Sequence, residues 1–217
     1  MKSGHYLAVS CLLFCMATGT VMSAEDHPFL LPDENSLARL RMGEVVLEND
    51  TADENGAAAS ILVFIQAPVE RIWSIIVSCR YAQAFVAGLK ICEVLEERSD
   101  YALTRQVVDE GRMTPRFDYT FAIERQPYRQ MNFRLVEGNL KAMHGSWDFE
   151  SFADGVLLRH VLVLQPVLPA PRWLVRRNMK QNLPDMMRCI RGLAAGGGSE
   201  QATRADRLKC PGEVRQG

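Results

Sequence analysis

The sequence predicts a single domain of the α+β class, in which an antiparallel sheet packs against a long C-terminal helix. Three observations predict this class. Segments with strand character follow one another instead of alternating with helices. Short polar turns separate most of them, which is the spacing of hairpins in an antiparallel sheet. The last segment of the domain has apolar residues at helical spacing, and strands and helices that occupy separate runs are typical of α+β folds.

The region ahead of the main domain, residues 25–57, is predicted to be an N-terminal arm followed by a first edge strand. Its prolines exclude regular structure at the start of the arm. The dipeptide Asn55-Gly56 is typical of a hairpin turn. The elements expected around it are a helix over 34–41, an edge strand at 45–47 and a buried strand over 58–66.

The main domain is expected to span residues 58–195. Pro68 favours a helix start, because a proline near a helix N-terminus loses no hydrogen bond, and Gly88 ends a second helical piece. Aromatic and apolar residues alternate with polar ones in the segments that follow. The expected elements are helices over 67–77 and 81–86; strands over 89–97, 101–109, 116–125, 130–137, 140–152 and 156–165; and a helix over 172–194.

The long final helix should carry one apolar stripe, with Pro184 kinking or interrupting it. A sheet that bends around such a helix encloses a space, and small apolar ligands usually bind in spaces of this kind. Three consecutive glycines follow the helix. The remainder, residues 196–217, is polar and mixed in charge, so it is predicted to be a disordered tail.

Residues 1–24 have the pattern of a cleavable secretory signal. Lys2 is the only formal charge, an apolar run covers 7–16, and small residues lead to Ala24. The run is too short to span a bilayer, which favours cleavage over retention as a membrane anchor, the alternative interpretation. We therefore expect cleavage after Ala24 and export across the inner membrane to the periplasm.

The charge balance argues against nucleic acid as a partner. The formal net charge is −1 at pH 7, which gives no long-range attraction for a polyanion. A transient contact with a membrane surface is left open by a basic cluster, although such clusters are usually only solvated. That cluster lies near the start of the final helix and consists of Arg172, Arg176, Arg177 and Lys180.

The cysteines indicate a disulfide rather than a metal site. Four remain outside the signal, with no C-x-x-C pair and no Cys/His cluster at zinc spacing. An oxidising compartment favours pairing. Cys79 and Cys92 are the candidate pair, which would tie the end of a helix to the following strand. Two separate buried thiols are the alternative, because cysteine is often a simple core residue.

Three stretches carry a resemblance to a known family. They are residues 65–73 (IQAPVERIW), residues 85–96 (FVAGLKICEVLE), and a third set formed by 138–149, 157–160 and 166–175. In this order and spacing they resemble the START-like superfamily, also called SRPBCC or polyketide-cyclase/coenzyme Q-binding domains. Two positions depart from the family pattern. Ala87 stands where proline is usual, and His160 stands where tyrosine is common.

The resemblance implies a helix-grip fold, in which a curved antiparallel sheet holds a long C-terminal helix over a hydrophobic cavity. Members bind lipids, sterols, quinones or aromatic polyketides, and some are cyclases or hydrolases. Strand alternation points Trp147 inward and places His160 on an apolar face, where it would bond to a ligand or only to the protein. The cavity candidates are Phe117, Phe121, Met131, Phe133, Trp147, His160 and Met179; ordinary core packing is the competing interpretation.

The leading functional hypothesis is a periplasmic carrier or binding protein for a hydrophobic small molecule, namely a lipid, quinone or aromatic compound. No nucleophile motif stands beside a histidine, so no catalytic residue, metal or cofactor is assigned. A cyclase- or hydrolase-type enzyme that uses His160 as acid or base is one alternative. A protein-interaction module without a ligand is another.

Overall fold

The computed structural model describes residues 29–53, 56–111, 115–167, 172–196 and 210–212. Within these ranges the side chains of residues 50, 52, 53 and 172–178 are not described. The chain divides into two units, residues 1–30 and 31–217. In the first unit only Phe29 and Leu30 are described, so the predicted signal lies outside the described residues. The structural account below concerns the second unit.

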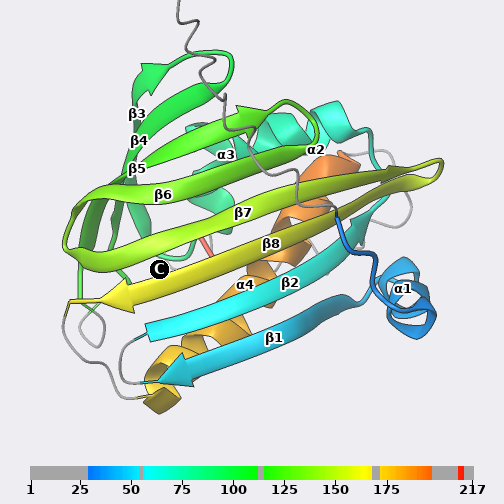
Figure 1. Cartoon of the computed structure of the whole chain (residues 1–217), viewed down its shortest axis with the longest axis horizontal. Coiled ribbons are helices and arrows are strands. Elements are labelled where there is room, and N and C mark those ends of the chain that lie inside the picture. Colours follow the sequence, from blue (N-terminus) through cyan, green and yellow to red (C-terminus); the bar gives the residue numbers. More distant parts are fainter. Residues whose placement is uncertain (1–28, 54–55, 112–114, 168–171, 197–209, 213–217) are drawn as a thin grey trace, which may run out of the picture. The chain divides into compact units, whose positions relative to one another are not determined.

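Eight strands form one antiparallel sheet, drawn in Figure 1 with the helices around it. The order across the sheet is β1-β2-β8-β7-β6-β5-β4-β3, so the strands β3 to β8 follow one another as successive hairpins. The strands are β1 (Val45–Asp53), β2 (Gly56–Ile65), β3 (Leu89–Glu97), β4 (Tyr101–Val108), β5 (Phe117–Gln126), β6 (Gln130–Gly138), β7 (Leu140–Phe152) and β8 (Gly155–Pro166).

Four helices accompany the sheet in the described part of the chain, and the α+β class is confirmed. Figure 1 shows α4 running across one face of β1, β2 and β8. The two short helices α2 and α3 connect β2 to β3, and α3 packs against β3. The helices are α1 (Glu34–Arg41), α2 (Val69–Ile76), α3 (Cys79–Phe85) and α4 (Arg172–Ala195).

Strand β1 is longer than the sequence analysis expected. It was predicted at residues 45–47, whereas the structure extends it to Asp53, which pairs with Gly56 of β2. Its polar C-terminal half carries no apolar pattern, so periodicity does not reveal it. Pairing with β2 supplies the backbone hydrogen bonds that hold this half as a strand.

Helix α4 is fixed by its apolar stripe. Met187 and Ile190 are fully buried against Ile61 and Val63 of β2, in the main hydrophobic core. Burying such side chains stabilises the fold by about 1.5–3 kcal/mol each. Buried apolar residues of α4, among them Ile190 of the predicted stripe, therefore hold the helix on the sheet.

Two further features complete α4. The helix continues through Pro184, where a kink or an interruption was expected. Lys180 and Gln181, one turn earlier, are exposed, so water can hydrogen-bond to the backbone carbonyl oxygen that Pro184, without an N–H, cannot. At the other end, Arg71 of α2 donates from Nε to the Ala194 carbonyl oxygen at 2.6 Å and from Nη2 to that of Leu193 at 3.0 Å. A cation at a helix C-terminus satisfies terminal carbonyls and opposes the helix dipole.

Two disulfides join cysteines of the described residues. Cys79, the first residue of α3, is bonded to Cys92 of β3, which is the pair proposed from the sequence. The second bond joins Cys189 of α4 to Cys210 and was not predicted. Both of its cysteines are buried. Among the described residues, no helix is long and apolar enough to cross a membrane.

The second disulfide corrects the prediction of a disordered tail over 196–217. At residues 210–212 that prediction is wrong, because Cys210 is buried in the core and bonded to α4. The backbone N–H of Gly212 also donates to the Ala84 carbonyl oxygen of α3 at 2.8 Å. The polar composition of this segment gave no indication that Cys210 is buried and forms a disulfide with Cys189. Residues 197–209 and 213–217 lie outside the described residues.

Replacing Cys189 and Cys210 together by alanine should lower the free energy of unfolding by about 3 kcal/mol. The reason is that the disulfide closes the loop between residues 189 and 210 and so restricts the unfolded chain. Urea denaturation of the oxidised protein measures the change. As a control, alkylation in urea without reductant should label neither cysteine of the wild type. An unchanged free energy of unfolding, or labelling of either thiol, would contradict the tether.

Candidate functional site

A cavity of about 350 Å³ lies between the sheet, the α2–α3 region and α4. Its size falls in the range of small-molecule sites, and its lining is mainly apolar, as such sites usually are. The strands that supply the lining are mostly β4 to β8, which lie beyond the part of the sheet that α4 covers most closely. The structure brings all seven cavity candidates together in this lining: Phe117, Phe121, Met131, Phe133, Trp147, His160 and Met179.

Five rings form a continuous surface along the sheet side of the cavity, which we call the aromatic wall: Tyr119, Phe121, Phe133, His160 and Trp147. Tyr119 and Phe121 of β5 have ring centroids 6.0 Å apart, and Phe121 meets Phe133 of β6 edge-on at 6.4 Å. His160 of β8 is stacked on Phe133 at 5.8 Å and on Trp147 of β7 at 3.8 Å. Contacts of this kind contribute about 0.5–1.5 kcal/mol each beyond burial, so they stabilise the wall.

Gly145 of β7 has no side chain, so the aromatic wall can continue over β7 from Phe133 to His160. It pairs with Phe133 of β6 on one side and Leu162 of β8 on the other. A Cβ atom at this position would lie 2.7 Å from Cζ of Phe133 and would collide with the Val161 carbonyl oxygen. The Phe133 ring therefore occupies the space that any other side chain at position 145 would fill, and from there it reaches His160.

His160 is buried and has a defined tautomer. Its Nδ1 lies 3.0 Å from the carbonyl oxygen of Ser146 on β7. A carbonyl oxygen only accepts, so Nδ1 carries the proton and donates it. Burial lowers the pKa of His160 to about 4, because a charged ring would lose its hydration. The imidazole is neutral at pH 7, and Nε2 bears a lone pair.

The other polar groups of the lining bond mostly to one another. The Tyr119 hydroxyl donates to Oε1 of Gln106 at 3.0 Å, and Gln106 donates from Nε2 to the Cys92 sulfur at 3.8 Å. Burial raises the pKa of the Tyr119 phenol, so this group also stays neutral. The first disulfide, between Cys79 and Cys92, is part of the lining itself.

One end of the cavity reaches the surface of the described residues. Pro115 lines the cavity and is also exposed, which places an end of the cavity beside the segment between β4 and β5. There Asn182 of α4 donates from Nδ2 to Oε1 of Glu110 at 3.1 Å. This hydrogen bond joins the helix to the end of β4 at the polar end of the cavity.

Strand alternation could have found some lining residues that the sequence analysis missed. Tyr119 shares a strand face with Phe117 and Phe121, so the signal for it was present. Thr104 and Gln106 line the cavity from β4, but their polarity hid the inward face of that strand. Asn182 was missed because, on the final helix, the sequence analysis considered only the apolar stripe and its methionines.

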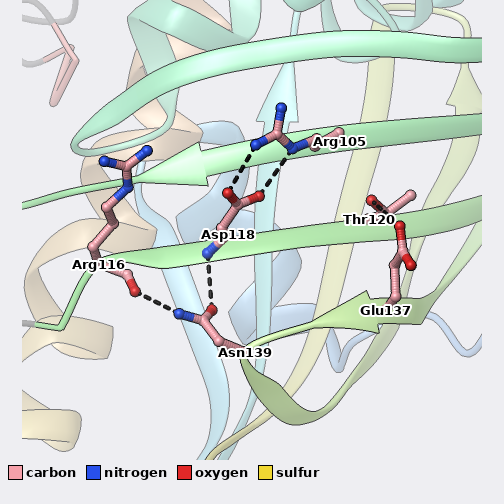
Figure 2. Close-up of polar contacts among 6 residues, drawn as sticks. All are labelled: Arg105, Arg116, Asp118, Thr120, Glu137 and Asn139. Atoms are coloured by element: carbon pink, nitrogen blue, oxygen red, sulfur yellow. Dashed lines mark hydrogen bonds and ion pairs between the residues drawn. The ribbon is translucent and has the colours of Figure 1, made fainter.

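The opposite face of the same strands carries charge. Figure 2 shows Arg105 of β4 bonded through two of its three guanidinium nitrogens to Asp118 of β5, with Nε–Oδ1 at 3.0 Å and Nη2–Oδ2 at 2.8 Å. The Asp118 N–H also donates to Asn139 at 2.8 Å, and Asn139 donates to the Arg116 carbonyl oxygen at 2.7 Å. The Arg105 guanidinium holds the pKa of the Asp118 carboxyl below its usual value. This network ties neighbouring strands together outside the cavity.

The sequence matches the family model described as polyketide cyclase/dehydrase and lipid transport over residues 65–191. The chain belongs to this family. No protein of curated function matches the sequence. Among the described residues, no group of three or more His, Cys, Asp or Glu side chains could hold a metal ion.

The fold of this chain is similar to that of solved helix-grip structures. The protein TTHA0849 of Thermus thermophilus is 18% identical, with a TM-score of 0.57 over 65% of this chain and 99% of that one. A STAR-related lipid transfer protein of Xanthomonas axonopodis is 12% identical, with a TM-score of 0.52 over 66% and 92%. The di-domain ARO/CYC protein StfQ of the steffimycin biosynthetic pathway is 11% identical, with a TM-score of 0.53 over 65% and 51%.

The buried neutral His160 should make stability depend on pH. Its folded-state pKa of about 4 lies below the ordinary value of 6.5, so the unfolded chain binds the proton more readily. Its contribution is complete above about pH 6.5 and is lost as the pH falls toward 4. Between pH 7.5 and 5 we expect the free energy of unfolding to fall on the order of 2 kcal/mol more in the wild type than in His160→Phe.

Urea denaturation at each pH measures this difference. The matched control is His144→Phe, which makes the same substitution at an exposed position of β7 and should keep the wild-type pH dependence. Equal pH dependence in the wild type and His160→Phe would contradict a buried neutral ring.

Proposed function

We propose that this protein binds and carries a hydrophobic small molecule, a lipid, quinone or aromatic compound, in the cavity between the sheet and α4. The observation that carries the proposal is the cavity of about 350 Å³, enclosed mainly by apolar and aromatic side chains. An apolar ligand that leaves water for such a site gains about 25 cal/mol per Å² of buried surface. The aromatic wall is already assembled, so little ordering opposes binding.

The family gives independent support for a ligand of this chemistry. Its description joins polyketide cyclisation and dehydration with lipid transport, and one structural relative is named as a lipid transfer protein. All of these functions need a cavity that accepts hydrophobic molecules. Among these functions we favour carriage without reaction, because His160 is neutral and carries its proton on Nδ1.

An enzyme of cyclase or hydrolase type, with His160 as acid or base, is the second candidate. It is suggested by an imidazole that lies in the cavity wall with Nε2 unbonded among the described residues. The neutral ring carries its proton on Nδ1, so Nε2 has none to give to a substrate at neutral pH. A pKa of about 4 also makes Nε2 a weak base. Both properties favour hydrogen bonding to a ligand over proton transfer.

We further propose that the protein acts after export, in the periplasm. The two disulfides support this location, since together they use all four cysteines that follow the predicted signal. Disulfides form and persist in oxidising compartments and are rare in the cytosol. A transient contact with the membrane surface fits a carrier of lipids, and Lys180 of the basic cluster is exposed; the side chains of Arg172, Arg176 and Arg177 lie outside the described residues.

Replacing Trp147 by alanine should weaken binding of cis-parinaric acid, a fluorescent polyene fatty acid, about tenfold. Trp147 lines the cavity and stacks on His160, and the loss of a buried tryptophan at a binding site commonly costs more than 1 kcal/mol. Direct excitation of the polyene gives the Kd without using tryptophan emission. Trp73→Ala is the matched control, because Trp73 packs on Phe149 and Tyr128 outside the lining. Unchanged affinity in a folded Trp147→Ala protein would contradict this cavity as the binding site.

Export can be tested with the full chain carrying a C-terminal tag. The protein recovered from the periplasm of a bacterial host should begin at Glu25. A control with Leu12→Arg and Leu13→Arg interrupts the apolar run and should keep the chain uncleaved in the cytoplasm. Recovery of a membrane-bound wild-type chain that still begins at Met1 would show an anchor instead.

A further inference from the structure

We propose that the ligand of this cavity carries a hydrogen-bond donor, a phenol or alcohol hydroxyl, and donates it to Nε2 of His160. The inference rests on the proposed function and narrows its ligand class. It depends on three features of the aromatic wall: the role of Nδ1, the accessible part of the imidazole, and the bonding of the other polar groups in the lining.

The first feature fixes Nε2 as an acceptor. Nδ1 donates to the Ser146 carbonyl oxygen on the neighbouring strand, and Trp147, the next residue, pairs directly with His160 in the sheet. The donor role of Nδ1 is therefore set by the backbone of β7 and not by a side chain that can rotate. In a neutral imidazole with Nδ1 protonated, Nε2 can only accept.

The second feature is the direction from which a ligand can approach. The imidazole is stacked on Trp147 at a centroid distance of 3.8 Å and on Phe133 at 5.8 Å, so at least one of its faces is covered by a ring. Nδ1 donates to the Ser146 carbonyl oxygen. The edge of the ring that carries Nε2 therefore remains for a hydrogen bond to a ligand. His160 lines the cavity, and the structure pairs only its Nδ1 among the described residues. Nε2 therefore has no hydrogen-bond partner among the described residues, and a ligand hydroxyl in the cavity would supply one.

The third feature is that most other polar groups of the lining already have protein partners. Tyr119 and Gln106 are bonded to each other, and Asn182 is bonded to Glu110 at the far polar end. The Thr104 hydroxyl, also buried in the lining, can both donate and accept, so it does not discriminate between ligands. Within the aromatic wall, Nε2 of His160 is an acceptor, so it favours a ligand with a donor there and disfavours one with an oxyanion at the same place.

The test compares two probes that differ at one substituent: 2-naphthol, which has a hydroxyl donor, and 2-methoxynaphthalene, in which a methyl group replaces the hydroxyl hydrogen. Isothermal titration calorimetry at pH 7 should give the naphthol a Kd about 2- to 10-fold lower, the value of one net hydrogen bond. This preference would oppose the greater hydrophobicity of the ether. In His160→Phe the preference should disappear while the ether still binds. His144→Phe, outside the cavity lining, should keep it.

The outcomes separate this inference from the proposed function. If both probes bind the wild type equally, or the preference survives in His160→Phe, the hydroxyl inference fails and the carrier proposal stands. If neither probe binds the wild type, the carrier proposal itself fails for ring compounds, and this inference fails with it.

A second measurement needs no variant and covers the case in which His160→Phe does not fold. Nitrogen-15 NMR of the wild-type imidazole should show a protonated Nδ1 and a free Nε2, and 2-naphthol should shift the Nε2 resonance while 2-methoxynaphthalene should not. A resonance that both probes move equally, or that neither moves on binding, would overturn the inference.

Discussion

The structure depends on the burial of one apolar stripe of α4 against one part of the sheet. The buried residues of the helix pack mainly on β2, and β1 and β8 lie beside it. A single helix is about 10 Å wide, so it cannot also fill the space over β4 to β7. Several lining side chains of β5 to β7 are large and aromatic, yet a space of about 350 Å³ remains between the sheet and the helix. The same packing that holds the fold together therefore creates the cavity.

Covalent and charged contacts keep the cavity wall in place around this space. The bond between Cys79 and Cys92 holds α3 on β3, and its atoms form part of the lining. The bond between Cys189 and Cys210 holds a distant segment of the chain on α4. On the opposite face of the sheet, Arg105 and Asp118 fasten β4 to β5, as Figure 2 shows. Polar interactions thus stabilise the face of the sheet that lies away from the cavity, while the face that lines the cavity is mainly apolar.

Much of this arrangement can be predicted from the sequence, because turns and alternation are local properties. Polar hairpin turns located β3 to β8 closely, and alternation along β5, β6 and β7 identified the rings that face the cavity. Other features depend on partners far away in the chain. The role of Nδ1 in His160 follows from the register between β7 and β8, and the bond between Cys189 and Cys210 crosses a stretch without any pattern. The need for glycine at position 145 follows only from the position of the Phe133 ring in the folded protein.

The aromatic wall contains two titratable side chains, and its environment shifts both toward the uncharged form. Burial lowers the pKa of His160 to about 4 and raises that of Tyr119 above its ordinary value of 10.0. From mildly acidic to mildly alkaline solution the wall therefore presents the same neutral surface to whatever occupies the cavity. A carrier built in this way would not unload its cargo in response to acidity at these rings. Release would have to come from movement of the protein or from a competing apolar phase.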